Sequence, residues 1–150
     1  MREPFWPKAD PMKPMTRKAS VRWTGGSRDG SGAMTTESGA LAQTQYSSGT
    51  TLKKRRGTNP AELIAAAHAG SFSMALANEL GAAGFVPNHI ATIATVTLER
   101  LAAGWTMSTI NLNVLAKVPK AAQGDFIDAI LRAKTGCPIS RLLRANISMN

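Results

Sequence analysis

The chain has 150 residues, of which 43% are hydrophobic and only 5% aromatic, and its net charge is +9. This length suits one domain whose core is built mainly from aliphatic side chains. No run of about 18 apolar residues occurs, so we expect no transmembrane helix and no membrane partner. The single cysteine, Cys137, excludes a disulfide within the chain and fits a reducing compartment, so we expect a cytoplasmic protein.

The excess of basic residues is open to two interpretations. We interpret it as the solvated surface of a soluble basic protein and do not expect nucleic acid as a partner. The densest positive charge is the run Lys53–Arg56. The alternative is a non-catalytic binding protein that uses this basic loop for anionic partners, with an affinity that falls as salt rises.

The N-terminal part of the chain begins with a segment rich in proline and basic residues that has no helical or strand periodicity. We predict a disordered tail over residues 1–18, with Met15 as an alternative start to Met1, and a folded domain over residues 19–150. Alternating residues then predict a meander of three strands. The strands are Ser20–Thr24, Gly32–Thr36 and Leu41–Tyr46, and a loop follows over Ser47–Gly57.

The most informative stretch begins at Asn59 and predicts a long central helix. The side chain of Asn59 can cap the helix, Pro60 suits its first position, and the charge of Glu62 favours its positive end. Gly81 and Gly84 supply the end of the helix. Alanine is abundant and polar residues are few, so we expect protein to cover most of the helix surface.

After the central helix, two alternating segments joined by a short connection predict an antiparallel hairpin. An amphipathic helix with Phe126, Ile127 and Ile130 facing inward follows, and a short helix begins at Pro138. The predicted ranges are Ile90–Glu99 and Trp105–Val118 for the hairpin strands, Asp125–Lys134 for the helix, and Asn146–Met149 for a last strand.

Four sequence words carry a resemblance to a known family. They are TTESG (Thr35–Gly39), GTNPAELIAAAHA (Gly57–Ala69), FSMAL (Phe72–Leu76) and TGCPIS (Thr135–Ser140). In this order and spacing they resemble the OsmC/Ohr family of organic hydroperoxide reductases, and its OsmC branch most closely. The resemblance implies an α+β fold with an antiparallel sheet around a long central helix, an intertwined homodimer, and a role in oxidative-stress defence.

The resemblance also implies a set of site residues. In the family a cysteine at the position of Ser71 attacks the peroxide, the equivalent of Cys137 resolves the resulting sulfenic acid as a disulfide, and a dithiol partner reduces it again. A loop arginine holds the thiolate, and the equivalent of Glu62 orients that arginine. No cofactor or metal is implied. Counted without gaps, the arginine position falls on Thr51, and Arg55 or Arg56 could substitute in a shifted loop.

Ser71 is the departure that matters most. A hydroxyl is a poor nucleophile toward peroxide oxygen and cannot form a sulfenic acid, so we expect no activity by the family mechanism. The serine is engineered or natural, and the further departure at Thr51 favours natural divergence. The pocket could still bind a small apolar peroxide or a related ligand. A sensor that uses Cys137 alone is a further alternative, whereas a Ser71–His68 hydrolase lacks the sharp turn that such a nucleophile needs.

Overall fold

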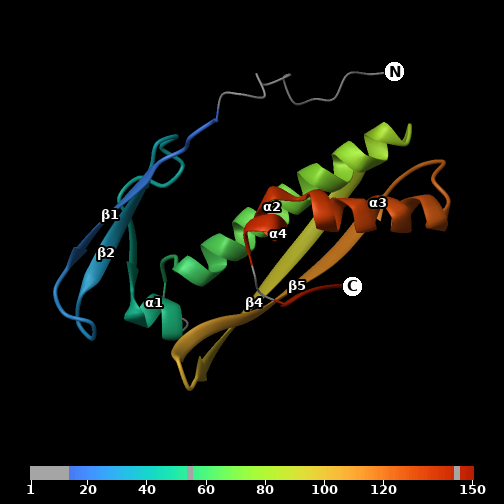
Figure 1. Cartoon of the computed structure of the whole chain (residues 1–150). Coiled ribbons are helices and arrows are strands. Elements are labelled where there is room, and N and C mark those ends of the chain that lie inside the picture. Colours follow the sequence, from blue (N-terminus) through green and yellow to red (C-terminus); the bar gives the residue numbers. More distant parts are fainter. Residues whose placement is uncertain (1–13, 54–55, 144–145) are drawn as a thin grey trace. The chain divides into compact units, whose positions relative to one another are not determined.

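A computed structural model describes residues 14–53, 56–143 and 146–150 of the chain, without the side chains of Asn146 and Ile147. Contacts divide it into two compact units, one reaching to Leu63 and the other running from Ile64 to Asn150. Each unit is described by itself (Figure 1). Most of the predicted tail, including Met1, lies outside the described residues. Residues 14–18 are exposed and without regular structure.

The first unit contains the predicted meander, which is confirmed. Strands β1 (Ala19–Thr24), β2 (Ser31–Thr36) and β3 (Thr44–Ser47) form an antiparallel sheet in that order. The prediction that the third strand begins at Leu41 is wrong. Threonine hydroxyls of β2 bind this segment instead: Leu41 N–H donates to Thr36 Oγ1 at 3.0 Å and Gln43 N–H donates to Thr35 Oγ1 at 3.1 Å.

The segment predicted as a loop over Ser47–Gly57 includes a short helix, α1 (Ser48–Leu52). A reciprocal cap stabilises its start. Ser47 Oγ accepts from Thr50 N–H at 3.3 Å, and Thr50 Oγ1 accepts from Ser47 N–H at 2.8 Å. This pair satisfies backbone donors at the first turn, which is the usual function of a capping box.

The predicted central helix is α2 (Pro60–Ala82), and its predicted cap is confirmed because Glu62 N–H donates to Asn59 Oδ1 at 2.9 Å. Of the two glycines predicted to end the helix, Gly81 lies within α2, and the chain turns away after it at Gly84, whose φ of 87° is easily adopted by glycine. The fully buried part of the helix surface is narrower than predicted. Only one stripe is fully covered, with residues four apart, and it consists of His68, Phe72, Leu76 and Leu80.

The second unit is built on a long antiparallel hairpin, as predicted. Strands β4 (His89–Leu101) and β5 (Gly104–Lys117) pair along their length, with a bulge between Thr97 and Leu98. Helices α3 (Gln123–Gly136) and α4 (Pro138–Leu142) follow, and then strand β6 (Asn146–Met149). Figure 1 shows α2 lying along the hairpin. The fully buried core joins α2, β5, α3 and the residue after α3, and it consists of Phe72, Leu76, Leu80, Ile110, Leu112, Ala129, Ala133 and Cys137.

Two details of this unit correct the predictions. Strand β6 pairs with β5 in parallel, so the sheet is not antiparallel throughout. Ile127 is 48% exposed and does not face inward. The buried row of α3 contains Ala129 and Ala133, with Phe126 and Ile130 partly buried beside them. Within the described residues, no helix is both long and apolar enough to cross a membrane.

Candidate functional site

Ser71 and Cys137 are held by different elements of the second unit. Ser71 is half-buried on α2, next to the buried Phe72. Cys137 links α3 to α4 and is fully buried. Its N–H donates to Ala133 O at 2.8 Å, and its carbonyl accepts from Arg141 N–H at 3.0 Å. The following proline disfavours helical geometry at Cys137 and suits the first position of α4, so the thiol is placed by backbone constraints on both sides.

The structure brings the two predicted thiol positions together. Ser71 Oγ lies 3.3 Å from Cys137 Sγ, and either atom could donate the hydrogen bond. These residues are 66 positions apart in the chain. The pairing of Ser71 with Cys137 was predicted only through the family resemblance, and the contact is compatible with that prediction. The hydroxyl of Ser71 is thus in hydrogen-bond contact with the buried thiol of Cys137.

The thiol of Cys137 is in an unusual environment for a buried cysteine. Burial raises its pKa, because the thiolate is poorly solvated there. Hydrogen bonds from the Ser71 and Ser140 hydroxyls and from the backbone of Ser140 and Ile139 lower it, and together they outweigh burial. The net effect is a pKa below the ordinary value, so neutral donors around the sulfur favour the thiolate.

Sequence reasoning did not single out Ser140, and it rejected a hydrolase that pairs His68 with Ser71. His68 was considered as a partner of Ser71 on the same helix. Instead its Nε2 lies 2.8 Å from Ser140 Oγ, and its ring is fully buried. The spacing of Cys137 and Ser140 across the first turn of α4 is a signal that could have pointed to Ser140, because residues three apart share a helix face.

The burial of His68 makes the stability of the chain sensitive to acid. Burial lowers the pKa of His68, so its stabilising contribution is complete above about pH 6.5, the ordinary value, and is lost as pH falls through the lowered pKa. We expect the urea midpoint to fall between pH 7 and about pH 5. His68→Gln should weaken that fall.

The matched control is His89→Gln, the same change at the exposed histidine that opens β4. It should leave the wild-type pH dependence in place. A His68→Gln variant whose midpoint falls as steeply as that of the wild type would contradict the expectation.

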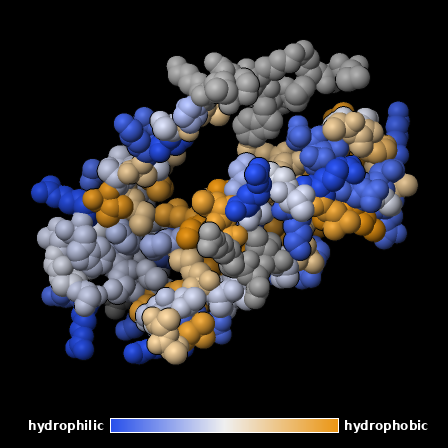
Figure 2. Space-filling model, viewed as in Figure 1, coloured by the Kyte–Doolittle hydropathy of each residue, from blue (hydrophilic) through white to orange (hydrophobic). Residues whose placement is uncertain are grey.

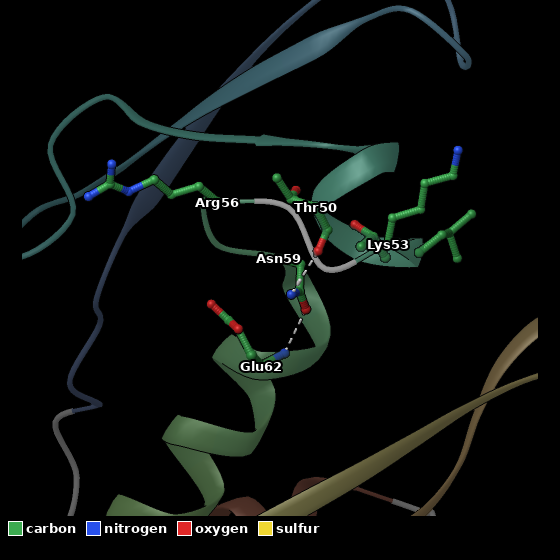
Figure 3. Close-up of a pocket in the computed structure, with 8 residues that line it drawn as sticks. Thr50, Lys53, Arg56, Asn59 and Glu62 are labelled. Atoms are coloured by element: carbon green, nitrogen blue, oxygen red, sulfur yellow. Dashed lines mark hydrogen bonds between the residues drawn. The ribbon is translucent and has the colours of Figure 1, made fainter.

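The first unit contains a separate pocket of about 550 Å³ around the start of α2 (Figure 3). It is lined by residues of α1, the basic loop and the helix start: Thr50, Thr51, Leu52, Lys53, Arg56, Gly57, Asn59 and Glu62. Thr51, Arg56 and Glu62, three of the predicted site residues, therefore share one pocket. Arg55 lies outside the described residues.

The side chains in this pocket differ in how firmly they are held. Glu62 Oε1 accepts from Thr58 Oγ1 at 2.8 Å, and Thr51 Oγ1 donates to the carbonyl of Ser47, the residue that caps its own helix, at 3.0 Å. Figure 3 shows the Arg56 side chain extending away from Asn59, in the direction opposite to that of Lys53. Arg56 as a substitute for the family arginine stays a prediction. In the part of the chain that the structure describes, no cluster of three metal-binding side chains occurs.

Comparison with known proteins decides the family. The family described as "OsmC-like protein" matches residues 52–150. The chain belongs to the OsmC-like family. It is 42% identical over 134 residues to the protein named "Peroxiredoxin OsmC" from Escherichia coli. The match covers 89% of this chain and 94% of that relative. The same figures hold for the Shigella flexneri protein of that name.

Solved structures support the OsmC-like fold. An OsmC-like protein from Mycoplasma pneumoniae has a TM-score of 0.73 at 14% identity, covering 91% of this chain and 95% of that one. An organic hydroperoxide resistance protein from Elizabethkingia anophelis has a TM-score of 0.70 at 22% identity, covering 92% and 94%. The predicted α+β, OsmC-like fold class is therefore confirmed.

Proposed function

We propose that the chain is an OsmC-type protein of organic hydroperoxide defence whose thiol-dependent peroxidase reaction is silenced at Ser71. Family membership and the name of the Escherichia coli relative support the hydroperoxide part of this proposal. The 3.3 Å contact between Ser71 Oγ and Cys137 Sγ is the observation that supports the loss of the peroxidase reaction. A hydroxyl lies beside the Cys137 thiol, where the two-thiol reaction needs the sulfur of the attacking cysteine.

The chemistry of oxygen and sulfur explains the expected loss. The two-cysteine reaction requires a thiolate that attacks the O–O bond and a second thiol that condenses with the resulting sulfenic acid. A serine hydroxyl ionises far less readily than a thiol and is a poor nucleophile toward peroxide oxygen. Cys137 is the chain's single cysteine, so the intramolecular disulfide cannot form. The proposal therefore includes an organic hydroperoxide as the substrate, and a dithiol reductant as the partner, of a site that has thiols at both positions.

The test is consumption of an organic hydroperoxide with a small dithiol as reductant, measured for the unmodified chain beside its Ser71→Cys variant. We expect turnover in the variant only. Turnover in the unmodified chain at a rate equal to that of the variant would overturn the proposal and would assign the reaction to Cys137. The same assay without dithiol distinguishes turnover from a single oxidation.

We also propose that the active assembly is a homodimer, as the resemblance implies. Apolar side chains are exposed on several elements of the second unit, including Met74 at 45%, Ile93 at 68% and Leu115 at 68%. Figure 2 shows apolar, orange areas at several places on the surface in view. Burying such side chains between copies would stabilise a dimer by about 25 cal/mol per Å² of apolar surface.

Light scattering coupled to size exclusion is expected to give the mass of two chains. Replacing Ile93 and Leu115 together by lysine places charge on this exposed apolar surface and should favour the monomer. A monomeric mass for the unmodified chain across micromolar concentrations would exclude the dimer.

The alternative of an anion-binding protein is second to this proposal. Lys53 and Arg56 line the pocket of the first unit, but the carboxylate of Glu62 lines it too and reduces the positive charge that an anion would meet. A cytoplasmic location is also part of the proposal, because a solitary thiol fits a reducing compartment.

A further inference from the structure

Helix α4 is a single short turn that begins directly after the buried Cys137. Arg141 N–H donates to Cys137 O at 3.0 Å, so Ser140 and Cys137 belong to one hydrogen-bonded turn of backbone. Cys137 is 0% exposed, although no residue of α4 itself is fully buried. Figure 1 shows α4 beside α2. Movement of α4 away from α2 would therefore carry Cys137 with it and bring the thiol toward solvent.

One side-chain hydrogen bond joins α4 to α2. Ser140 Oγ lies 2.8 Å from His68 Nε2. Among the described residues, α4 makes no other side-chain hydrogen bond to another element. Ile139 in α4 and Leu143 just after it are only partly buried against the core, and Leu142 is 74% exposed. Few apolar side chains therefore help this bond to hold α4 in place.

The ring of His68 depends on the same bond. The side chain is 0% exposed, and its other nitrogen, Nδ1, is buried without a hydrogen-bond partner among the described residues. A buried polar group that loses its last partner costs more free energy than a typical hydrogen bond contributes, because the group has lost its water as well. Without the Ser140 hydroxyl, the closed position of α4 becomes less favourable than an open one in which water reaches the ring.

We propose that α4 is a short flap over Cys137 and that the hydrogen bond between His68 and Ser140 holds it closed. In the closed position the bond keeps the Cys137 sulfur beside position 71, 3.3 Å from Ser71 Oγ. Opening breaks the bond and exposes the thiol to reagents in solution, while the rest of the second unit stays folded.

This inference deepens the proposed function, since it rests on Cys137 as the thiol that would resolve a cysteine at position 71. Its test uses the chain with Ser71 in place and needs no hydroperoxide turnover. Failure here would leave the Ser71→Cys experiment unaffected, and a silent Ser71→Cys variant would leave this test unaffected.

The experiment measures how fast a small neutral reagent, iodoacetamide, labels Cys137 in the folded chain. Because Cys137 is the single cysteine, mass spectrometry follows one label. A fully buried thiol reacts only after it has opened, so the labelling rate reports the population of the open state. Ser140→Ala should raise this rate about fivefold or more, as expected when a buried group loses its hydrogen-bond partner. Ser140→Thr keeps the hydroxyl and should stay within about twofold of the unmodified chain.

The matched control is Ser73→Ala, which removes a hydroxyl of α2 that lies 2.7 Å from Thr92 Oγ1 on β4. It should destabilise the chain as a lost hydrogen bond does, but leave the labelling rate within about twofold of the unmodified chain. A double variant, His68→Leu with Ser140→Ala, removes both polar partners. It should bring the rate back toward that of the unmodified chain, because an apolar pair leaves no buried polar group unsatisfied.

A merely structural role for the bond makes different predictions. Equal acceleration by Ser140→Ala and Ser73→Ala, or no acceleration by Ser140→Ala, would overturn the proposal. A double variant that is labelled faster than Ser140→Ala alone would overturn it as well.

A second measurement uses the unmodified chain and depends on no substitution. Opening of a flap exposes little surface, so the labelling rate of Cys137 should change little at urea concentrations that leave the chain folded. A rate that rises with urea as steeply as the constant for global unfolding would show that the thiol is exposed only when the whole chain unfolds, and the flap would be excluded.

Discussion

Ser71→Cys is expected to form a disulfide with Cys137 after one equivalent of organic hydroperoxide and to turn over when a dithiol is supplied. The new thiolate attacks the O–O bond, an alcohol leaves, and a sulfenic acid forms at position 71. The Cys137 thiol then condenses with it, releasing water and forming the disulfide. Ser71 Oγ already lies 3.3 Å from Cys137 Sγ, so a small rotation brings two sulfurs to the bond length of about 2.05 Å.

The rate of hydroperoxide consumption should rise at least about tenfold over the unmodified chain, which corresponds to about 1.4 kcal/mol in activation free energy. Mass spectrometry of the oxidised variant under non-reducing conditions should find the two peptides that contain positions 71 and 137 joined. Adding Cys137→Ser to Ser71→Cys should abolish that joined species while leaving the initial attack intact.

Ser73→Cys is the matched control on the same helix. Ser73 Oγ donates to Ala69 O at 2.8 Å and lies 2.7 Å from Thr92 Oγ1 on β4, so a cysteine there meets the sheet and not Cys137. It should form no disulfide with Cys137. If Ser71→Cys were silent and unlinked while remaining folded, the loss of function would extend beyond the serine, and the departure at Thr51 would be the next candidate.

Leu76→Ala is expected to destabilise the chain by about 2–5 kcal/mol, the range for deleting a fully buried leucine side chain. Leu76 is 0% exposed and lies in the middle of the buried stripe of α2, in the same cluster as Ile110 and Leu112 of β5. Removing its side chain leaves a cavity between helix and sheet that a close-packed core cannot refill. Urea denaturation followed by circular dichroism measures the change.

The control for this change is Leu131→Ala on α3, an identical substitution at a side chain that is 57% exposed. Surface changes of this kind typically stay within about 0.5 kcal/mol. Equal losses for the two variants would contradict the placement of Leu76 in the core. A large loss for Leu131→Ala alone would mean that α3 packs on its other face.

Local sequence determined the elements whose start or end depends on neighbouring residues. Asn59 and Glu62 predicted the beginning of α2, and Gly81 and Gly84 its end, because caps and left-handed positions are satisfied within a few residues. Gly81 proved to lie within the helix, and only Gly84 takes the left-handed position. Alternating residues in β4 and β5, joined by a short connection, predicted the hairpin, because this pattern is also contained in neighbouring residues. Helix α1 was missed although its capping box is equally local, since Ser47 and Thr50 were interpreted as loop residues.

Only the tertiary structure decided which side chains meet. Nothing near Ser71 in the sequence indicates that its hydroxyl contacts a thiol 66 residues away, and that pairing was predicted through a family resemblance alone. The link from His68 to Ser140 spans 72 residues and was not predicted at all. Helical periodicity assigns a residue to a face, but the packing of α2 against α4 decides what that face touches. The sequence therefore determined the local elements and the absence of a second thiol, and packing decided the environment of the one thiol present.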